Sequence, residues 1–306
     1  MTTTPQSIAG RVVRPDITVV EVGPRDGLQN EAARISTPDK IAFVDRLSAA
    51  GLRDIEVSAF VSPTWVPQLA DAAEVFAGIT RTPGVRYSAL VPNMKGLDRA
   101  MAAGVSDVAV FAAASETFSR RNTNRSIDAS CDIYREVTSA ANAAGLRVRG
   151  YLSTAFGCPF EGDVPVERVV SLTERLLDMG VFQVAVSDTI GIAHPGQVRA
   201  LLPKLLAVVP VANVALHFHD TRGTALANVL AALDFGVATF DASAGGLGGC
   251  PYAPRATGNL ATEDLLYMLH GLGINTGTDL TAVSDAALAM APLVGHRIAS
   301  RYSQAR

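Results

Sequence analysis

The sequence predicts a closed α/β barrel of eight parallel strands, the (β/α)8 or TIM barrel. Short runs rich in β-branched residues recur roughly every 22 to 40 residues, and each is followed by an Ala- and Leu-rich stretch with helical periodicity. No break in composition divides the chain. Eight such units favour the closed barrel over an open doubly wound sheet, which typically has fewer strands and a nucleotide-binding fingerprint after the first.

Each unit can be placed from its residue pattern. The strands are predicted at residues 17–22, 54–60, 85–91, 107–113, 147–155, 182–188, 213–219 and 239–244. The helices between them are predicted at 37–50, 65–77, 95–103, 127–144, 166–179, 197–208 and 224–235. Several helices end in a glycine that leads into the next strand, as helix C-termini prefer, namely Gly51, Gly104, Gly145, Gly180 and Gly236.

The two ends of the chain differ from the repeated units. Residues after 262 carry two further helical patterns, and we expect this C-terminal extension, 262–306, to pack over the barrel. The first 15 residues have the composition of a flexible tail. Because no linker separates these parts, the sequence predicts a single barrel domain over residues 1–306.

Composition and charge exclude several functional classes. With 48% hydrophobic and 18% charged residues, the chain is globular rather than disordered or fibrous. A net charge of −3 predicts neither a nucleic-acid nor a membrane partner. The three cysteines, Cys131, Cys158 and Cys250, are too few and too scattered for a disulfide framework. We therefore expect a cytoplasmic protein that acts on a small molecule.

Polar residues at the ends of the predicted strands are the candidates for chemistry, because active sites of such barrels lie there. Arg25 and Asp26 follow the first strand directly, although such a pair can also be a simple turn salt bridge. Glu56 lies in the second strand among apolar neighbours, where a buried carboxylate needs a partner. Asp188 lies at the end of the sixth strand.

Two histidines close the seventh strand. His217 and His219 are two residues apart, so their side chains lie on the same face of the strand. If Asp26 lies opposite them, one carboxylate and two imidazoles form a mixed nitrogen and oxygen site suited to a divalent cation such as Mg²⁺ or Mn²⁺. A hydrogen-bonded His–Asp network without a metal is the alternative.

A glycine-rich segment, AGGLGGCPY, follows the eighth strand and carries Cys250. It is not a dinucleotide-binding fingerprint, because it follows the last strand and opens no obvious helix. Cys250 on this loop is a candidate proton donor or redox-sensitive group, or an incidental cysteine. Asn259 can either cap the following helix or ligate a metal, and Thr262 competes for the capping role.

Taken together, these motifs resemble the 3-hydroxy-3-methylglutaryl-CoA (HMG-CoA) lyases, a family of TIM-barrel enzymes in the DRE-TIM metallolyase superfamily. The resemblance extends from about residue 19 to residue 278 and rests on VEVGPRDGLQNE, SAFVSPTWVPQ, FAAASETFSRRN, RGYLSTAFGCPFEG, DTIG, HFHDTRGTALAN and GLGGCPYAPRATGNLATEDL. RDGLQNE combined with GGCPYA and GNLATEDL is the most specific part. Related barrel enzymes share the Arg-Asp and His-x-His pieces but lack the cysteine loop.

The resemblance implies retro-Claisen cleavage of HMG-CoA to acetyl-CoA and acetoacetate. It implies that Asp26, His217 and His219 bind a divalent cation, Mg²⁺ or Mn²⁺, with Asn259 among the ligands or their surroundings. The cation would hold the C3 hydroxyl and the terminal carboxylate of the substrate, and Asp26 or His217 would accept the hydroxyl proton.

Further roles follow from the same resemblance. Arg25 would stabilise the enolate of acetyl-CoA, as an oxyanion hole does, and Cys250 would supply or relay the final proton. Glu56 and Asp188 would support the site electrostatically. Asn122 would contact CoA, and the chain could form a homodimer. The nearby arginines either hold CoA phosphates or belong to an ordinary solvated loop, namely Arg120, Arg121 and Arg125.

Two alternatives stay open. Ala59 and Ala185 stand where animal members of the family usually carry serine, so the pocket could accept an acyl group bulkier than methyl. The same chemistry on another substrate, such as 3-hydroxy-3-isohexenylglutaryl-CoA, is therefore the first alternative. A barrel that binds without catalysing is the second. A condensing enzyme is disfavoured, because the cysteine loop does not belong to that chemistry.

Overall fold

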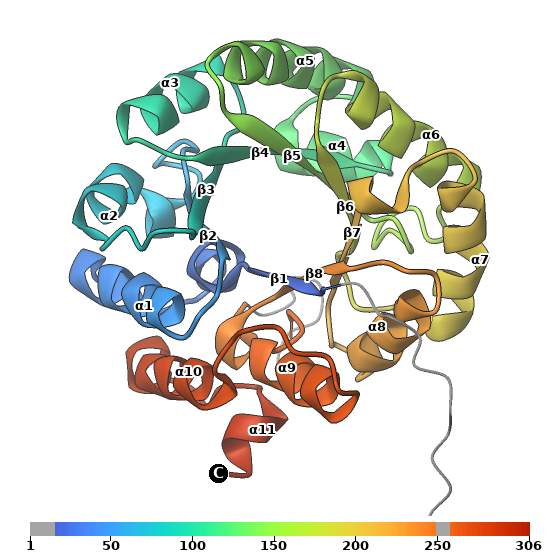
Figure 1. Ribbon diagram of the computed structural model, residues 1–306. Coiled ribbons are helices and arrows are strands. Elements are labelled where there is room, and N and C mark those ends of the chain that lie inside the picture. The colour runs from blue at the N-terminus through green and yellow to red at the C-terminus, as the bar shows by residue number, and fades with distance from the viewer. Residues whose placement is uncertain (1–15, 249–257) are drawn as a thin grey trace, which may run out of the picture.

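A computed structural model describes residues 16–248 and 258–306, and these form a closed barrel whose parallel strands follow one another in sequence order (Figure 1). The predicted fold is confirmed. The strands are β1 (Thr18–Glu21), β2 (Asp54–Ala59), β3 (Arg86–Leu90), β4 (Asp107–Ala113), β5 (Arg147–Ser153), β6 (Gln183–Asp188), β7 (Val214–Phe218) and β8 (Thr239–Ala242). The tail predicted at residues 1–15 lies outside the described residues.

The strands are buried on both faces, which explains their almost continuous apolar runs. Every residue of β6 and of β7 is buried. The barrel closes where β1 pairs with β8 in parallel, with Thr18 opposite Thr239 and Glu21 opposite Ala242. This closure brings the first and the last strand-end loops side by side at one end of the barrel.

Helices surround the strands (Figure 1). They are α1 (Thr37–Ala49), α2 (Ala72–Gly78), α3 (Met94–Ala102), α4 (Glu116–Thr123), α5 (Ile127–Ala143), α6 (Val166–Asp178), α7 (Pro195–Leu206), α8 (Ala225–Leu233), α9 (Thr262–Gly271), α10 (Leu280–Val294) and α11 (Arg301–Gln304). The glycines predicted to end helices all have a positive φ, between 69° and 95°, namely Gly51, Gly104, Gly145, Gly180 and Gly236. This conformation suits glycine and turns the chain back toward the sheet.

The helix predicted at 65–77 was wrong in extent. The chain instead forms a short 3₁₀ turn, η2 (Pro67–Leu69), and then α2. Asp71, between them, accepts hydrogen bonds from Thr37 and Lys40, both at 2.7 Å. These contacts hold the chain against α1, and such tertiary bonds override helical periodicity. The helix α4 was not predicted, although Ser115 caps it by accepting a hydrogen bond from Phe118 N at 3.1 Å.

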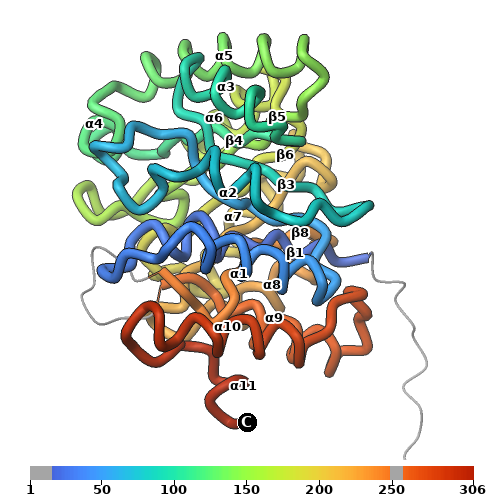
Figure 2. The backbone as a smooth tube through the Cα atoms, turned by 90° about the vertical axis from the view of Figure 1, so that its left-hand side faces the viewer, coloured from blue at the N-terminus to red at the C-terminus, as the bar shows by residue number. Residues whose placement is uncertain are grey.

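The predicted C-terminal helices are present, but they lie in the side wall of the barrel. Helices α9 and α10 occupy the part of the outer ring between α8 and α1 (Figure 1), and Asp279 N donates to Ala50 O at 2.8 Å. Figure 2 shows α11 and the C-terminus outside this ring. Among the described residues, no helix has the length and apolar character needed to span a membrane.

Candidate active site

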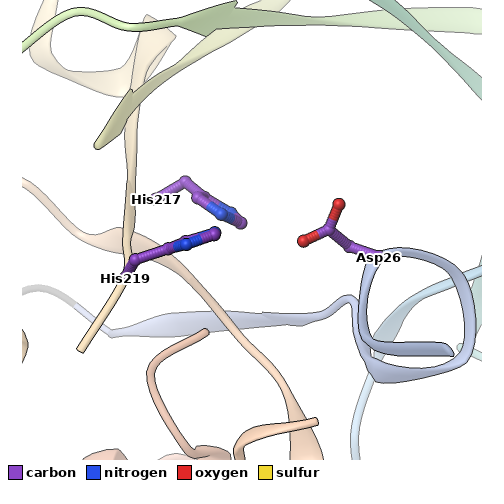
Figure 3. Close-up of side chains that lie close together, drawn as sticks. All are labelled: Asp26, His217 and His219. Atoms are coloured by element: carbon purple, nitrogen blue, oxygen red, sulfur yellow. The ribbon is translucent and has the colours of Figure 1, made fainter. Parts of the chain in front are cut away.

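Three side chains converge at the carboxyl ends of β1 and β7 (Figure 3). Asp26 lies in η1 (Gly23–Gly27), a π-helical turn that follows β1, while His217 lies in β7 and His219 follows that strand. One ligand atom from each residue can be chosen so that all three lie within 4.8 Å of one another. Figure 3 shows both imidazole rings directed toward the carboxylate of Asp26. The structure therefore places Asp26 opposite the two histidines.

The surroundings of Asp26 and His219 favour the protonation states in which these residues can bind a metal. Burial alone would raise the pKa of Asp26, but Arg25 and then the two histidines outweigh it and lower that pKa to about 2. Burial, followed by the proximity of His217, lowers the pKa of His219 to about 3. At neutral pH the carboxylate is ionised and the imidazole of His219 is neutral, as metal binding requires.

Asn259 completes the group from the far end of the chain. Its Nδ2 donates to Asp26 Oδ2 at 2.9 Å and to Leu247 O at 3.1 Å. It does not cap α9: Ala261 is the N-cap residue and makes no side-chain capping bond, and Thr262 Oγ1 donates to Glu21 at 2.7 Å. Both capping interpretations of Asn259 and Thr262 were therefore wrong.

The donor set fits a divalent cation. Among the described residues, His219 Nδ1 and Asn259 Oδ1 are buried and make no hydrogen bond. Unpartnered buried polar atoms are costly, and a cation beside Asp26 would provide the missing partner. Imidazole, carboxylate and amide donors together suit Mg²⁺, Mn²⁺ or a similar ion rather than a thiolate-bound one.

Arg25 is held on three sides beside this group. Its Nε donates to Glu56 Oε2 and its Nη1 to Asp26 Oδ1, both at 2.6 Å, and its guanidinium lies 5.1 Å from the ring centre of Tyr151. Burial alone would lower the pKa of Arg25, but Glu56 and then Asp26 outweigh it and raise that pKa. The Arg25–Asp26 contact is therefore more than a turn salt bridge, because the same guanidinium also bonds to Glu56 on the neighbouring strand β2.

Glu56 has the partners that its burial demands on one carboxylate oxygen, while its Oε1 is buried without a hydrogen bond among the described residues. Its Oε2 accepts from Arg25 Nε at 2.6 Å and from Tyr151 OH at 3.0 Å. Burial raises the pKa of Glu56 despite the attraction of Arg25. The structure thus brings Glu56 into direct contact with Arg25, as a support for the guanidinium.

The sequence interpretation missed three buried residues beneath this site. Arg149 and Tyr151 lie on β5 and Asp241 on β8, and they bond to one another or to His217 and Glu56. The available signal was strand alternation, since charged or polar residues at positions i and i+2 of a buried strand point into the barrel together. That signal identifies their face but not their partners.

Asp188 is not brought into the group. Its carboxylate accepts from the backbone N–H groups of Ile192 at 3.0 Å and Ala193 at 2.9 Å, and burial raises its pKa to about 6. Ser187 and Thr189 line the cavity instead. Successive side chains of a strand point to opposite faces, so Asp188 is directed away from the barrel interior and fixes the following loop.

A cavity of about 630 Å³ opens beside these residues. Asn122 lies on its wall, and its Nδ2 donates to Phe118 O at 3.0 Å. The basic segment predicted as a loop lies largely in α4. Of its arginines only Arg125 lines the cavity.

The other two arginines face protein partners. Arg120 pairs with Glu116 at 3.3 Å, and Arg121 lies 4.1 Å from the ring centre of Phe160. Neither Arg120 nor Arg121 lines the cavity. Cys250 lies outside the described residues, so its proposed role stays a prediction.

Comparisons with known proteins identify the family of this chain. The sequence profile of the HMGL-like family matches residues 16–289. The 3-hydroxy-3-isohexenylglutaryl-CoA/hydroxymethylglutaryl-CoA lyase of Pseudomonas aeruginosa is 52% identical over 94% of this chain and 96% of its own. The crystal structure of the Bacillus subtilis HMG-CoA lyase superposes with a TM-score of 0.94 at 50% identity, covering 95% of this chain and 97% of that one.

A third relative carries bound ligands. The HMG-CoA lyase of Acinetobacter baumannii, solved in complex with coenzyme A and 3-methylmalate, is 40% identical with a TM-score of 0.90, over 95% of each chain. The predicted family resemblance is thus confirmed over nearly the whole sequence. The chain belongs to the HMGL-like family.

Proposed function

We propose that this protein is a divalent-metal-dependent carbon–carbon lyase that cleaves HMG-CoA to acetyl-CoA and acetoacetate. The observation that carries the proposal is the convergence of Asp26, His217 and His219 beside the buried Arg25. Family membership supports the reaction class, and the neutral and ionised forms of the ligands support the metal. Mg²⁺ and Mn²⁺ both suit such donors.

The cavity suits an acyl-CoA. Its volume of about 630 Å³ lies in the range of small-molecule sites, and it extends from His217 to Asn122 and Arg125. The coenzyme A bound to the Acinetobacter relative supports the same ligand class here. We assign Asn122 and Arg125 to the CoA end, and Arg25 to the reacting end.

The reaction begins with removal of the proton from the C3 hydroxyl of the substrate. A divalent cation held by Asp26, His217 and His219 would lower the pKa of such a hydroxyl and attract the substrate's carboxylate. Asp26 or His217 would accept the proton, whichever of the two is not engaged by the cation at that moment. A pKa near 2 makes Asp26 the weaker base.

Cleavage then moves two electron pairs within the substrate. The oxygen–hydrogen electrons form the new C3 carbonyl, the C2–C3 bond breaks, and its electrons become the enolate of acetyl-CoA. Arg25 stabilises the enolate oxygen, because its guanidinium is already held by Glu56 and Asp26 and needs no reorganisation. Cys250 supplies or relays the proton to C2.

A coupled assay of acetyl-CoA release tests the proposal. The metal-loaded protein is offered HMG-CoA and 3-hydroxy-3-isohexenylglutaryl-CoA in parallel. We expect cleavage of HMG-CoA; no release from either thioester would overturn the proposal. The second substrate is included because the Pseudomonas relative is named for both thioesters. Ala59 and Ala185, from which the sequence suggested a larger pocket, are buried and do not line this cavity.

Two further aspects belong to the proposal. We place the enzyme in the cytoplasm, since Cys131 and Cys158 are buried and unpaired, as in a reducing compartment. We also propose a homodimer, because the adjacent helices α8 to α10 expose large apolar side chains, among them Leu230, Tyr267 and Leu288. Cell fractionation and sedimentation velocity test these two statements.

A further inference from the structure

A buried ion pair lies directly beneath His217. Arg149 on β5 donates from Nη2 to Asp241 Oδ1 at 2.7 Å and from Nη1 to Asp241 Oδ2 at 3.1 Å. The two side chains are 9% and 0% exposed, respectively. Burying an ion pair costs free energy unless its remaining polar atoms are also hydrogen-bonded. The other contacts of Arg149 and Asp241 therefore indicate what the pair does.

Those contacts lead to the candidate metal ligand. His217 Nδ1 lies 3.2 Å from Asp241 Oδ2, and the rings of Tyr151 and His217 are nearly perpendicular with 6.4 Å between their centres. Asp241, bonded twice by Arg149, is an ionised acceptor, so Nδ1 of His217 must be the donor. The lone pair of His217 is then on Nε2. Nδ1 donates to Asp241, so Nε2 is the nitrogen that remains available to bind a cation. The imidazole ring is directed at Asp26 (Figure 3).

We propose that Asp241 is a positioning residue that holds His217 in its Nδ1–H tautomer, and that Arg149 fixes Asp241 for this task. The inference rests on the proposed metal-dependent function and adds the residue that orients one ligand. Carboxylates that accept the second N–H of a ligating histidine orient the ring, and their loss typically weakens metal binding by about 10- to 100-fold.

A second ion pair in the same barrel shows what a purely structural pair looks like. Arg147, also on β5, bonds to Asp107 twice, at 3.0 and 2.8 Å, in the same side-by-side geometry. That pair borders a small cavity at the other end of the barrel, its arginine is 45% exposed, and no histidine contacts it among the described residues. It is therefore a matched control for Arg149 and Asp241.

The first test needs no substitution. Histidine ¹⁵N NMR of the metal-free protein, with the His217 signals assigned by loss in His217→Gln, reports which ring nitrogen carries the proton. We expect the Nδ1–H form of His217. A dominant Nε2–H form would overturn the proposal whatever the metal does.

The second test measures Mn²⁺ affinity by electron paramagnetic resonance. Replacing the pair together, Arg149→Met with Asp241→Leu, removes the acceptor without leaving a buried charge, and we expect Mn²⁺ to bind about 10- to 100-fold more weakly. Arg149→Met with Asp241→Asn restores a neutral acceptor oxygen, so affinity should largely return. The control, Arg147→Met with Asp107→Leu, should bind Mn²⁺ as the wild type does.

The outcomes separate this inference from the proposed function. A wild-type protein that binds no Mn²⁺ contradicts the metal site itself. Wild-type binding that is unchanged by loss of Asp241 contradicts the positioning role alone. If the Arg149→Met/Asp241→Leu protein does not fold, the NMR tautomer and the Asp241→Asn pair still decide the question.

Discussion

Arg25 links the loop after β1 to the strand β2 in the candidate active site. Its guanidinium contacts Asp26 of the first loop and Glu56 of the second strand, both at 2.6 Å, over the ring of Tyr151. Because these bonds fix its position before the reaction, its charge can act on the enolate without rearrangement. Single substitutions in this contact set therefore test the role of Arg25.

Replacing Arg25 by Met removes the charge and keeps most of the apolar stem. We expect kcat to fall by about 10²- to 10³-fold, as for loss of one oxyanion donor, with a much smaller change in KM. Steady-state kinetics of acetyl-CoA release measure both constants, and circular dichroism confirms the fold. An unchanged kcat would remove Arg25 from the mechanism. Arg168→Met, at a half-exposed arginine, is the control.

Replacing Tyr151 by Phe keeps the ring under Arg25 but removes the hydroxyl that donates to Glu56 at 3.0 Å and accepts from Arg149 at 3.1 Å. Both partners are charged groups, so we expect the free energy of unfolding to fall by about 1.5–3 kcal/mol, together with a lower kcat. Tyr87→Phe is the matched control, because the Tyr87 hydroxyl bonds to Ser48 away from the site. Equal kcat values in the two variants would contradict a link between Tyr151 and Arg25.

The sequence predicted the residues at strand ends and Glu56 within β2, but it did not predict Arg149, Tyr151 and Asp241 inside the barrel. Arg25, Asp26, His217 and His219 could be identified because their residue types are unusual beside apolar strands. The bond between Arg149 and Asp241 joins residues 92 positions apart, and only closure of the barrel brings them together. No local pattern contains that information.

The segments that follow β1 and β8 are hydrogen-bonded to one another through Glu21. Glu21, at the end of β1, accepts from Gly23 N and Ala244 N, each at 2.8 Å, and from Thr262 Oγ1 at 2.7 Å. The carboxyl group thus joins three segments that carry or support Asp26 and Asn259. Gly248 packs against the same loops, since a Cβ there would lie 2.7 Å from Asn259 Nδ2 and 3.0 Å from Gly27 Cα.

Replacing Gly248 by Ala should displace Asn259 from Asp26. Its φ of +94° also strains any L residue, by about 1–2 kcal/mol. We expect a lower melting temperature and at least tenfold weaker Mn²⁺ binding, measured by calorimetry and paramagnetic resonance. The control is Gly236→Ala, with a φ of +79° and open space around the missing Cβ. Equal Mn²⁺ affinity in both variants would show that the clash does not reach the ligands.

Buried carboxyl groups make the stability of these loops depend on pH. Burial raises the pKa of Glu263 from 4.5 to about 8, although its carboxyl accepts from Gly245 N at 2.8 Å. The folded protein therefore retains a proton that the unfolded chain loses above about pH 4.5. Stability contributed by this proton is complete at low pH and is lost as pH rises toward 8.

Glu263→Gln should flatten this dependence. We expect the free energy of unfolding of the wild-type protein to fall between pH 5 and pH 8. Each unit by which the folded-state pKa of Glu263 exceeds its unfolded value contributes about 1.4 kcal/mol to this fall. The free energy of unfolding of the variant should fall less. Urea titrations at both pH values measure the difference. Parallel losses in wild type and variant would contradict the raised pKa. Glu21, with a pKa of about 7, contributes in the same direction.

Element boundaries were predictable where they depend on local residues. The glycines after α1, α3, α5, α6 and α8 adopt the positive φ expected of them. The helix predicted at 65–77 was wrong because Asp71 bonds to Thr37 and Lys40 of another helix. Asn259 failed as a predicted cap for a similar reason, since Asp26 and Leu247 take its amide.

Closure of the barrel brings together residues that are far apart in the sequence. Eight parallel strands in sequence order place every strand end on the same rim, and pairing of β8 with β1 makes the first loop a neighbour of the last. Asp26 and Asn259 thus touch across 233 positions of sequence. The repeated strand–helix units made this closure predictable, although the individual bonds were not.

The most direct test of this account is acetyl-CoA release from HMG-CoA by protein stripped of metal and then titrated with Mn²⁺. We expect no turnover in the stripped protein and full recovery at one ion per chain, with Asp26→Asn failing to recover at the same concentration. Full turnover after exhaustive removal of metal would contradict the account.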